Sequence, residues 1–89
     1  MVVGRAARAA QVEAVLGRAH APAALDLLEL AEFAWHDCYG EITPPDDVVD
    51  DILICSRGDL AQMIRVTRLA VEDSRDLRIA ADALRAEDR

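Results

Sequence analysis

The sequence predicts a single all-α domain, and three observations carry that prediction. Apolar residues recur at alternating steps of four and three along the second half of the chain. An earlier stretch is apolar on one helical face, and alanine is abundant, with seventeen copies. Alternating steps of four and three keep one stripe of a helix facing a partner. With 89 residues there is room for one core, so we expect one domain over 1–89, frayed at 1–4 and 87–89.

The apolar seam in the second half is the most regular feature of the sequence. Its members are Val49, Leu53, Ser56, Leu60, Met63, Thr67, Ala70, Ser74, Leu77, Ala81 and Leu84. Ile64 and Val71 form a second apolar line beside it, and Ser56 and Thr67 interrupt it with polar groups. That width favours the inner face of a helical bundle over a simple two-stranded coil.

Two helices are expected before the seam. The first covers 5–16, where alanine dominates, and Gly17 is a suitable stop. The second covers 22–39, because Pro22 suits a first turn. Stepping 100° per residue gathers one apolar face on the second helix: Leu27, Leu28, Ala31, Ala34, Trp35 and Cys38. Phe33 stands alone among acids on the other side, either as a single exposed side chain or as part of a contact surface.

The seam itself begins after Thr43-Pro44-Pro45-Asp46, which is a helix start signal with a capping box. Ser56–Gly58 then predicts a kink or break, which would make the bundle three helices, or four if the chain breaks there. A strand over 51–55 is the local alternative. From Asp59 to Ala86 we expect one long helix, whose outer face carries the pairs Arg68–Glu72 and Arg78–Asp82.

The composition argues against several classes of function. The net charge is −7, which makes nucleic acid an unlikely partner because phosphates repel an acidic protein. No apolar run is long enough to cross a membrane, and no signal-peptide pattern is present. We therefore expect a cytoplasmic protein in which Cys38 and Cys55 are reduced, buried thiols. All ten basic residues are arginine, which with the alanine excess suggests a GC-rich, bacterial source.

The residue types that carry chemistry are densest at 35–39, where Trp35, His36, Asp37, Cys38 and Tyr39 are consecutive. On a helix, side chains two residues apart do not face one another, so a Cys–His nucleophile is not formed there. A zinc site would need a fourth ligand at a recognised spacing. We therefore expect no catalytic residue, no metal and no cofactor.

Acidic residues crowd the start of the third segment, at Asp46, Asp47, Asp50 and Asp51. They are either an anionic docking patch or a charged helix start that complements the helix dipole. The cluster lacks the central glycine and alternating ligands of a calcium loop.

Association is the function that the remaining features favour. The long helix at 59–86 would measure about 42 Å and the second helix about 27 Å, so part of the seam would overhang. We expect a small acidic non-enzymatic interaction module, a homodimer through Met63–Leu84 or a complex with another protein. The candidate interaction residues are Phe33, Met63, Thr67, Ala70, Leu77 and Leu84.

An alternative function comes from residues 60–71, which read Leu-Ala-Gln-Met-Ile-Arg-Val-Thr-Arg-Leu-Ala-Val. This stretch resembles the helix-turn-helix of small bacterial regulators, with Arg65 at the position of the usual turn glycine. The resemblance implies a DNA-binding regulator, with Thr67 and Arg68 at the groove.

Overall fold

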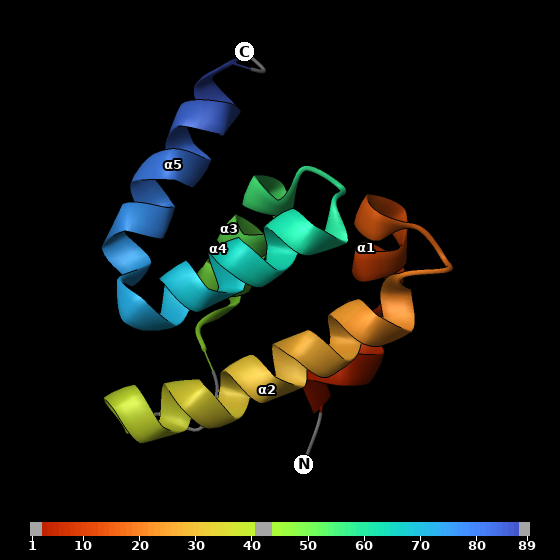
Figure 1. The fold of residues 1–89 in the computed structure, drawn as a ribbon, viewed down its shortest axis with the longest axis horizontal. Coiled ribbons are helices and arrows are strands. Elements are labelled where there is room, and N and C mark those ends of the chain that lie inside the picture. Colours follow the sequence, from red (N-terminus) through yellow and green to blue (C-terminus); the bar gives the residue numbers. More distant parts are fainter. Residues whose placement is uncertain (1–2, 41–43, 88–89) are drawn as a thin grey trace.

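The computed structural model describes residues 3–40 and 44–87, and these residues form five α-helices (Figure 1). The helices are α1 (Val3–Leu16), α2 (Ala21–Tyr39), α3 (Asp46–Ser56), α4 (Leu60–Glu72) and α5 (Ser74–Glu87). The all-α class is confirmed for this part of the chain. The expected three or four helices are too few, and the strand considered for 51–55 lies inside α3.

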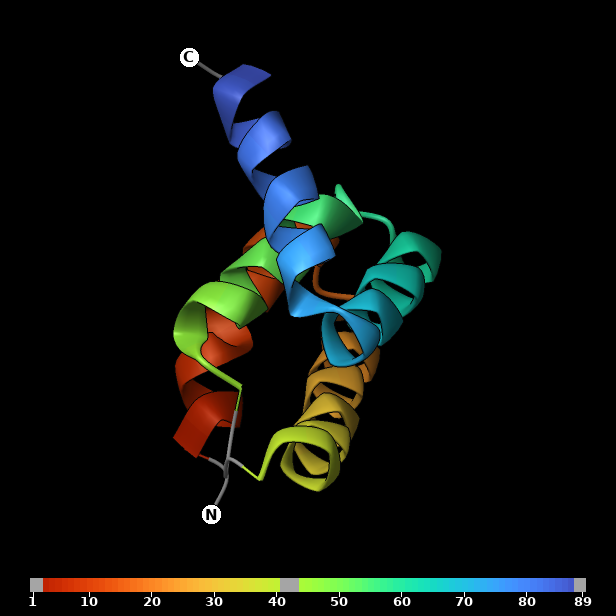
Figure 2. The same cartoon turned by 90° about the vertical axis from the view of Figure 1, so that its left-hand side faces the viewer.

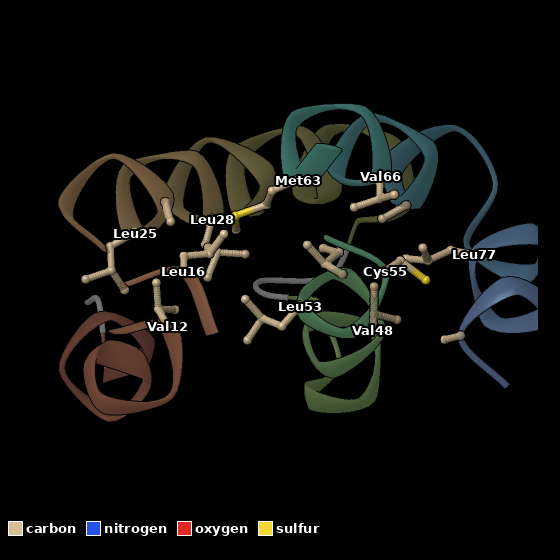
Figure 3. Close-up of a cluster of buried hydrophobic side chains, with 14 of the residues drawn as sticks. Val12, Leu16, Leu25, Leu28, Val48, Leu53, Cys55, Met63, Val66 and Leu77 are labelled. Carbon is tan, nitrogen blue, oxygen red and sulfur yellow. The ribbon is translucent and has the colours of Figure 1, made fainter. Parts of the chain in front are cut away.

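The helices pack in two layers with α5 at one side. Figure 3 shows α2 and α4 above α1 and α3, with the core side chains between them. The helix pairs with the most extensive contacts are α1–α2, α2–α4, α3–α4, α3–α5 and α4–α5. The C-terminal half of α5 projects beyond the other helices (Figure 2). The largest side chains that are almost fully enclosed are Val12, Ile52, Met63 and Leu77.

The break expected near Ser56–Gly58 is confirmed. Arg57 and Gly58 both adopt left-handed backbone conformations, with φ of 53° and 76°, and Asp59 caps α4 by accepting a hydrogen bond from the Ala61 amide. A Cβ added at Gly58 would lie 3.1 Å from the carbonyl oxygen of Val15. The turn therefore presses against α1, and glycine suits it both by conformation and by size.

The expectation of one long helix over Asp59–Ala86 is wrong, because the helix ends at Asp73. This single residue is extended, with φ −157° and ψ 92°, and its carboxylate accepts hydrogen bonds from the amides of Arg75 and Asp76. Asp73 thus caps α5, a position that aspartate favours over a helix interior. The corner turns α5 back onto α3, where Leu77 and Ala81 become fully buried.

The buried face that the seam predicted is present, although it is divided among α3, α4 and α5. Seven members are buried and the other four are half-buried. The buried ones are Leu53, Ser56, Met63, Thr67, Ala70, Leu77 and Ala81. The proposed cap at Thr43 lies outside the described residues. In the described part, Pro45 precedes α3 and gives no side-chain cap.

Candidate functional site

The outer face of α2 carries two of the three most exposed large apolar side chains among the described residues, and the third is Ile79 of α5. Phe33 is 71% exposed and Leu30 is 64% exposed. They lie three residues apart, so they are neighbours on the helix surface. We call the outer stripe of α2 the set Ala23, Leu27, Leu30, Phe33 and Ala34. Ala23 is exposed as well, and Leu27 and Ala34 are half-buried.

This arrangement makes α2 apolar on two sides. Its inner face buries Ala24, Leu28, Ala31 and Trp35. Leu30 and Phe33 of the outer stripe are exposed away from that core, while Leu27 at the edge of the stripe is partly packed against it. A helix of a small protein normally needs one apolar face only. The sequence indicated that Phe33 lies among acids. It did not indicate that Leu30 is exposed beside Phe33, because Leu30 flanks the inner face on a helical wheel.

Acidic groups accompany the outer stripe. The sequence of α2 contains four carboxylates, Asp26, Glu29, Glu32 and Asp37, and neither lysine nor arginine. Asp37 is exposed and lies one turn after Phe33. A surface that combines an apolar centre with acidic groups is suited to a partner that brings basic groups around its own apolar contact.

The remaining candidate interaction residues lie inside the molecule. Met63, Thr67, Ala70 and Leu77 are between 0% and 4% exposed, and Leu84 is half-buried. The overhang that suggested a dimer through Met63–Leu84 is reduced to the C-terminal half of α5 (Figure 2), because the corner at Asp73 lets the chain cover most of its own seam. In this conformation Met63, Ala70 and Leu77 belong to the core, and Thr67 is buried beside them.

The acidic cluster on α3 is an ion-pair network, which we call the arginine clasp: Asp46, Asp47, Asp50 and Asp51 with Arg8, Arg78 and Arg85. Asp51 is only 1% exposed, and its two oxygens accept from Arg78 Nε and Arg85 Nη2, both at 2.7 Å. Arg78 also contacts Asp47 at 2.7 Å. The clasp thereby ties α5 to α3.

The same cluster ties α1 to α3. Arg8 contacts Asp46 at 2.8 Å and Asp50 at 2.9 Å, and the Gln11 amide donates to Asp50 at 3.0 Å. The hydrogen bond from Gln11, followed by the contact with Arg8, lowers the pKa of Asp50 below its ordinary value, while burial opposes them. All four carboxylates therefore have arginine partners, so the cluster is not a free anionic patch.

One expected pair is replaced by this network. Arg78 pairs with α3 rather than with Asp82, and Asp82 contacts Arg85 at 2.9 Å. The other expected pair, Arg68–Glu72, is present at 2.8 Å. The spacing of four residues correctly predicted the pair within α4. It could not predict the pairs of Asp51, whose arginines are 27 and 34 residues away in sequence.

Two open hollows lie beside the clasp. The larger, of about 580 Å³, includes Val15, Leu53, Ile54, Arg57 and Arg85 in its wall. The smaller, of about 430 Å³, lies between Trp35 of α2, Val48 of α3 and Ser74, Arg78 and Ile79 of α5. The clasp carboxylates and arginines in these walls already bind one another, so they leave little polar chemistry for a ligand.

The two thiols lie on different helices, Cys38 on α2 and Cys55 on α3. Cys55 is buried, and burial raises the pKa of its thiol, which disfavours the thiolate that a nucleophile needs. Cys38 is exposed. No three His, Cys, Asp or Glu side chains in the described ranges form a group that could hold a metal ion.

A polar contact joins α2 to the end of α4. The rings of Trp35 and Tyr39 are 4.3 Å apart, centre to centre, and the Tyr39 hydroxyl donates to the carbonyl oxygen of Val71 at 2.9 Å. The buried Trp35 Nε1 and Thr67 Oγ1 have no hydrogen-bond partner.

A helix-turn-helix corner at Arg65 is absent, since α4 runs without interruption from Leu60 to Glu72. The corner lies before α4 instead, at Arg57–Asp59, so that α3 and α4 form two helices joined by a three-residue turn. Arg65 and Arg68 are exposed on α4. Thr67, expected at a DNA groove, is buried.

No helix in the described ranges combines the length and apolar character that a membrane span requires. The chain matches no protein-family model, no curated protein and no solved structure.

Proposed function

We propose that the chain is a small acidic, non-enzymatic interaction module that binds another protein through the outer stripe of α2. One observation carries the proposal: Leu30 and Phe33 are 64% and 71% exposed as neighbours on a helix that already buries its opposite face. Adjacent exposed apolar side chains are a common feature of protein contact surfaces. The partner contributes an apolar segment with basic side chains, since α2 supplies carboxylates and no arginine or lysine.

Affinity capture with three forms of the chain tests the contact. The baits are the natural chain, Phe33→Ser and Ile79→Ser, because Ile79 is a matched apolar residue, 69% exposed on α5. A specific partner is retained by the natural chain and by Ile79→Ser and is lost with Phe33→Ser. Binding is then measured with the purified partner. Equal retention by all three baits, or loss with Ile79→Ser alone, contradicts the proposal.

The charge of the partner is tested with a matched pair of substitutions. Asp37→Arg changes the border of the outer stripe, while Asp76→Arg makes the same change on α5, where Asp76 is exposed. We expect at least tenfold weaker binding for Asp37→Arg than for Asp76→Arg, from the loss of attraction and the added repulsion of a basic partner. Equal affinities contradict a basic partner while leaving the apolar contact intact.

DNA binding is the second candidate, supported by the three-residue turn with a glycine between α3 and α4. It would use the exposed Arg65 and Arg68 on α4. A net charge of −7 disfavours it. Retention of duplex DNA that falls steeply with salt and is weakened by Arg68→Ala would favour this candidate over the protein contact.

A further inference from the structure

The corner between α4 and α5 consists of one residue. Asp73 is extended, and helix continues on both sides of it. Neither glycine nor proline occurs between Leu60 and Glu87, so no residue in this stretch forbids a helix. The seam keeps its spacing across the corner, from Met63, Thr67 and Ala70 to Ser74, Leu77 and Ala81. A straight helix would therefore carry one continuous apolar stripe.

The backbone at the corner is already close to helical in its hydrogen bonding. The Asp73 amide donates to the Leu69 carbonyl at 2.6 Å, and the Leu77 amide donates to the Asp73 carbonyl at 3.4 Å. Both bonds span four residues, as in an α-helix. Straightening the chain requires new bonds only from the three amides that follow Asp73.

Two side chains satisfy backbone groups that a straight helix would pair with each other. The Asp73 carboxylate accepts from the amides of Arg75 and Asp76, at 3.1 and 3.3 Å. The Tyr39 hydroxyl donates to the Val71 carbonyl, which is the acceptor that the Arg75 amide would reach in a continuous helix. In the bent form the Asp73 carboxylate therefore satisfies the Arg75 amide, and the Tyr39 hydroxyl satisfies the Val71 carbonyl. In a straight helix these two backbone groups would bond to each other.

The contacts that α5 makes are equally available to a second copy. In the bent form α5 packs on α3 through Leu77 and Ala81 and through the pairs of Arg78 and Arg85 with Asp51. A straight helix over 60–87 would measure about 42 Å, longer than the 35 Å long dimension of the molecule. It would carry α5 away from its own α3, and the vacated surface would fit the α5 of another chain.

We propose that α5 exchanges between two copies of this chain, with Asp73 as the hinge. In the exchanged dimer α4 and α5 form one helix, and Arg78 and Arg85 of each chain pair with Asp51 of the other. The exchanged dimer contains two copies of the same core. The equilibrium between monomer and dimer therefore depends on the conformation that Asp73 prefers and on protein concentration. This inference does not rest on the outer stripe of α2 and stands or falls separately from it.

Sedimentation over a range from about 5 to 500 µM tests the hinge, using Asp73→Ala, Asp73→Asn and Tyr39→Phe. Alanine removes the cap and favours helix, whereas asparagine caps as well as aspartate. We expect Asp73→Ala to dimerise at a concentration at least about tenfold lower than the natural chain, because each dimer contains two hinges. Asp73→Asn stays close to the natural chain, and Tyr39→Phe shifts in the direction of alanine.

A distance within the chain distinguishes exchange from any other dimer. Spin labels at positions 61 and 83, both exposed alanines, are placed in a Cys38→Ser, Cys55→Ala background and diluted with unlabelled protein. In the exchanged form the 22 intervening steps of helix separate the two backbone positions by about 33 Å, and the bent form gives a shorter distance. A folded Asp73→Ala that remains monomeric at 500 µM overturns the proposal, as does a dimer with an unchanged distance. If Asp73→Ala fails to fold, sedimentation and the spin-label distance of Tyr39→Phe test the proposal in its place.

Discussion

The helices α2 and α3 both combine apolar residues with carboxylates, and they use them in opposite ways. The four aspartates at the start of α3 are paired with arginines of α1 and α5. By contrast, α2 lacks arginine and lysine and exposes apolar side chains beside its acids. Acidic residues that look like a surface patch in the sequence can therefore hold the fold together. The surface that we propose for a partner lies on the less densely charged helix.

The largest expected effect separates the two faces of α2. Leu28→Ala removes a side chain that is 7% exposed and should cost about 2–4 kcal/mol of unfolding free energy. Leu30→Ala, on the outer stripe, should change that free energy by less than about 0.5 kcal/mol. Urea denaturation of both variants measures the difference. Similar losses would mean that the outer stripe is packed against the molecule in solution.

The next effect compares one carboxylate from each helix. Asp51→Ala removes a buried acceptor of two charge-assisted hydrogen bonds and should lower the unfolding free energy by about 2–3 kcal/mol. Asp37→Ala, on the exposed side of α2, should leave it within about 0.5 kcal/mol. Thermal unfolding at one fixed pH compares the variants. Equal melting temperatures would show that the clasp does not hold α5.

A smaller effect should appear at low pH. Because the Gln11 hydrogen bond and the Arg8 contact hold the folded-state pKa of Asp50 below its ordinary value, these interactions contribute stability above about pH 4, the ordinary pKa of aspartate. That contribution is lost as the pH falls through the folded-state pKa. The Gln11→Ala variant should therefore lose less stability than the natural chain on acidification. Chemical denaturation between pH 6 and pH 3 measures both slopes, and parallel slopes contradict this assignment.

The smallest effect on stability is expected for the proposed contact itself. Phe33→Ser should leave the unfolding free energy within about 0.5 kcal/mol, or raise it slightly, because the ring is largely in water. Its loss of binding would then not be a folding defect. Circular dichroism and urea denaturation of the variant provide the check, and a large loss of stability would remove Phe33 from the list of surface residues.

Local patterns in the sequence predicted the all-α class and most of the buried face. Gly17 and Gly58 marked ends of helices, and steps of four and three selected side chains such as Met63 and Leu77, which are buried. These features depend on backbone preference and on one-sided burial, which a few neighbouring residues determine. The exposed position of Phe33 among acids was visible in the same way.

The corner at Asp73 and the clasp could not be predicted in that manner. The seam keeps its spacing through Asp73, and only the packing of α5 on α3 favours the bend. Asp51 meets its arginines across 27 and 34 residues of sequence, and no short spacing signals such a pair. The expectation of one straight helix over 59–86 was wrong for the same reason, because the chain folds back on itself at Asp73, and the predicted homodimer stays a prediction.

The position of Trp35 gives the molecule an internal optical reporter. It is the only tryptophan, it is 4% exposed, and its ring contacts Tyr39. It also lines the hollow that includes Ser74, the first residue after the corner. Its fluorescence therefore depends on the surroundings of the junction of α2, α3 and α5. Emission spectra of the natural chain can follow straightening of the corner without any added label.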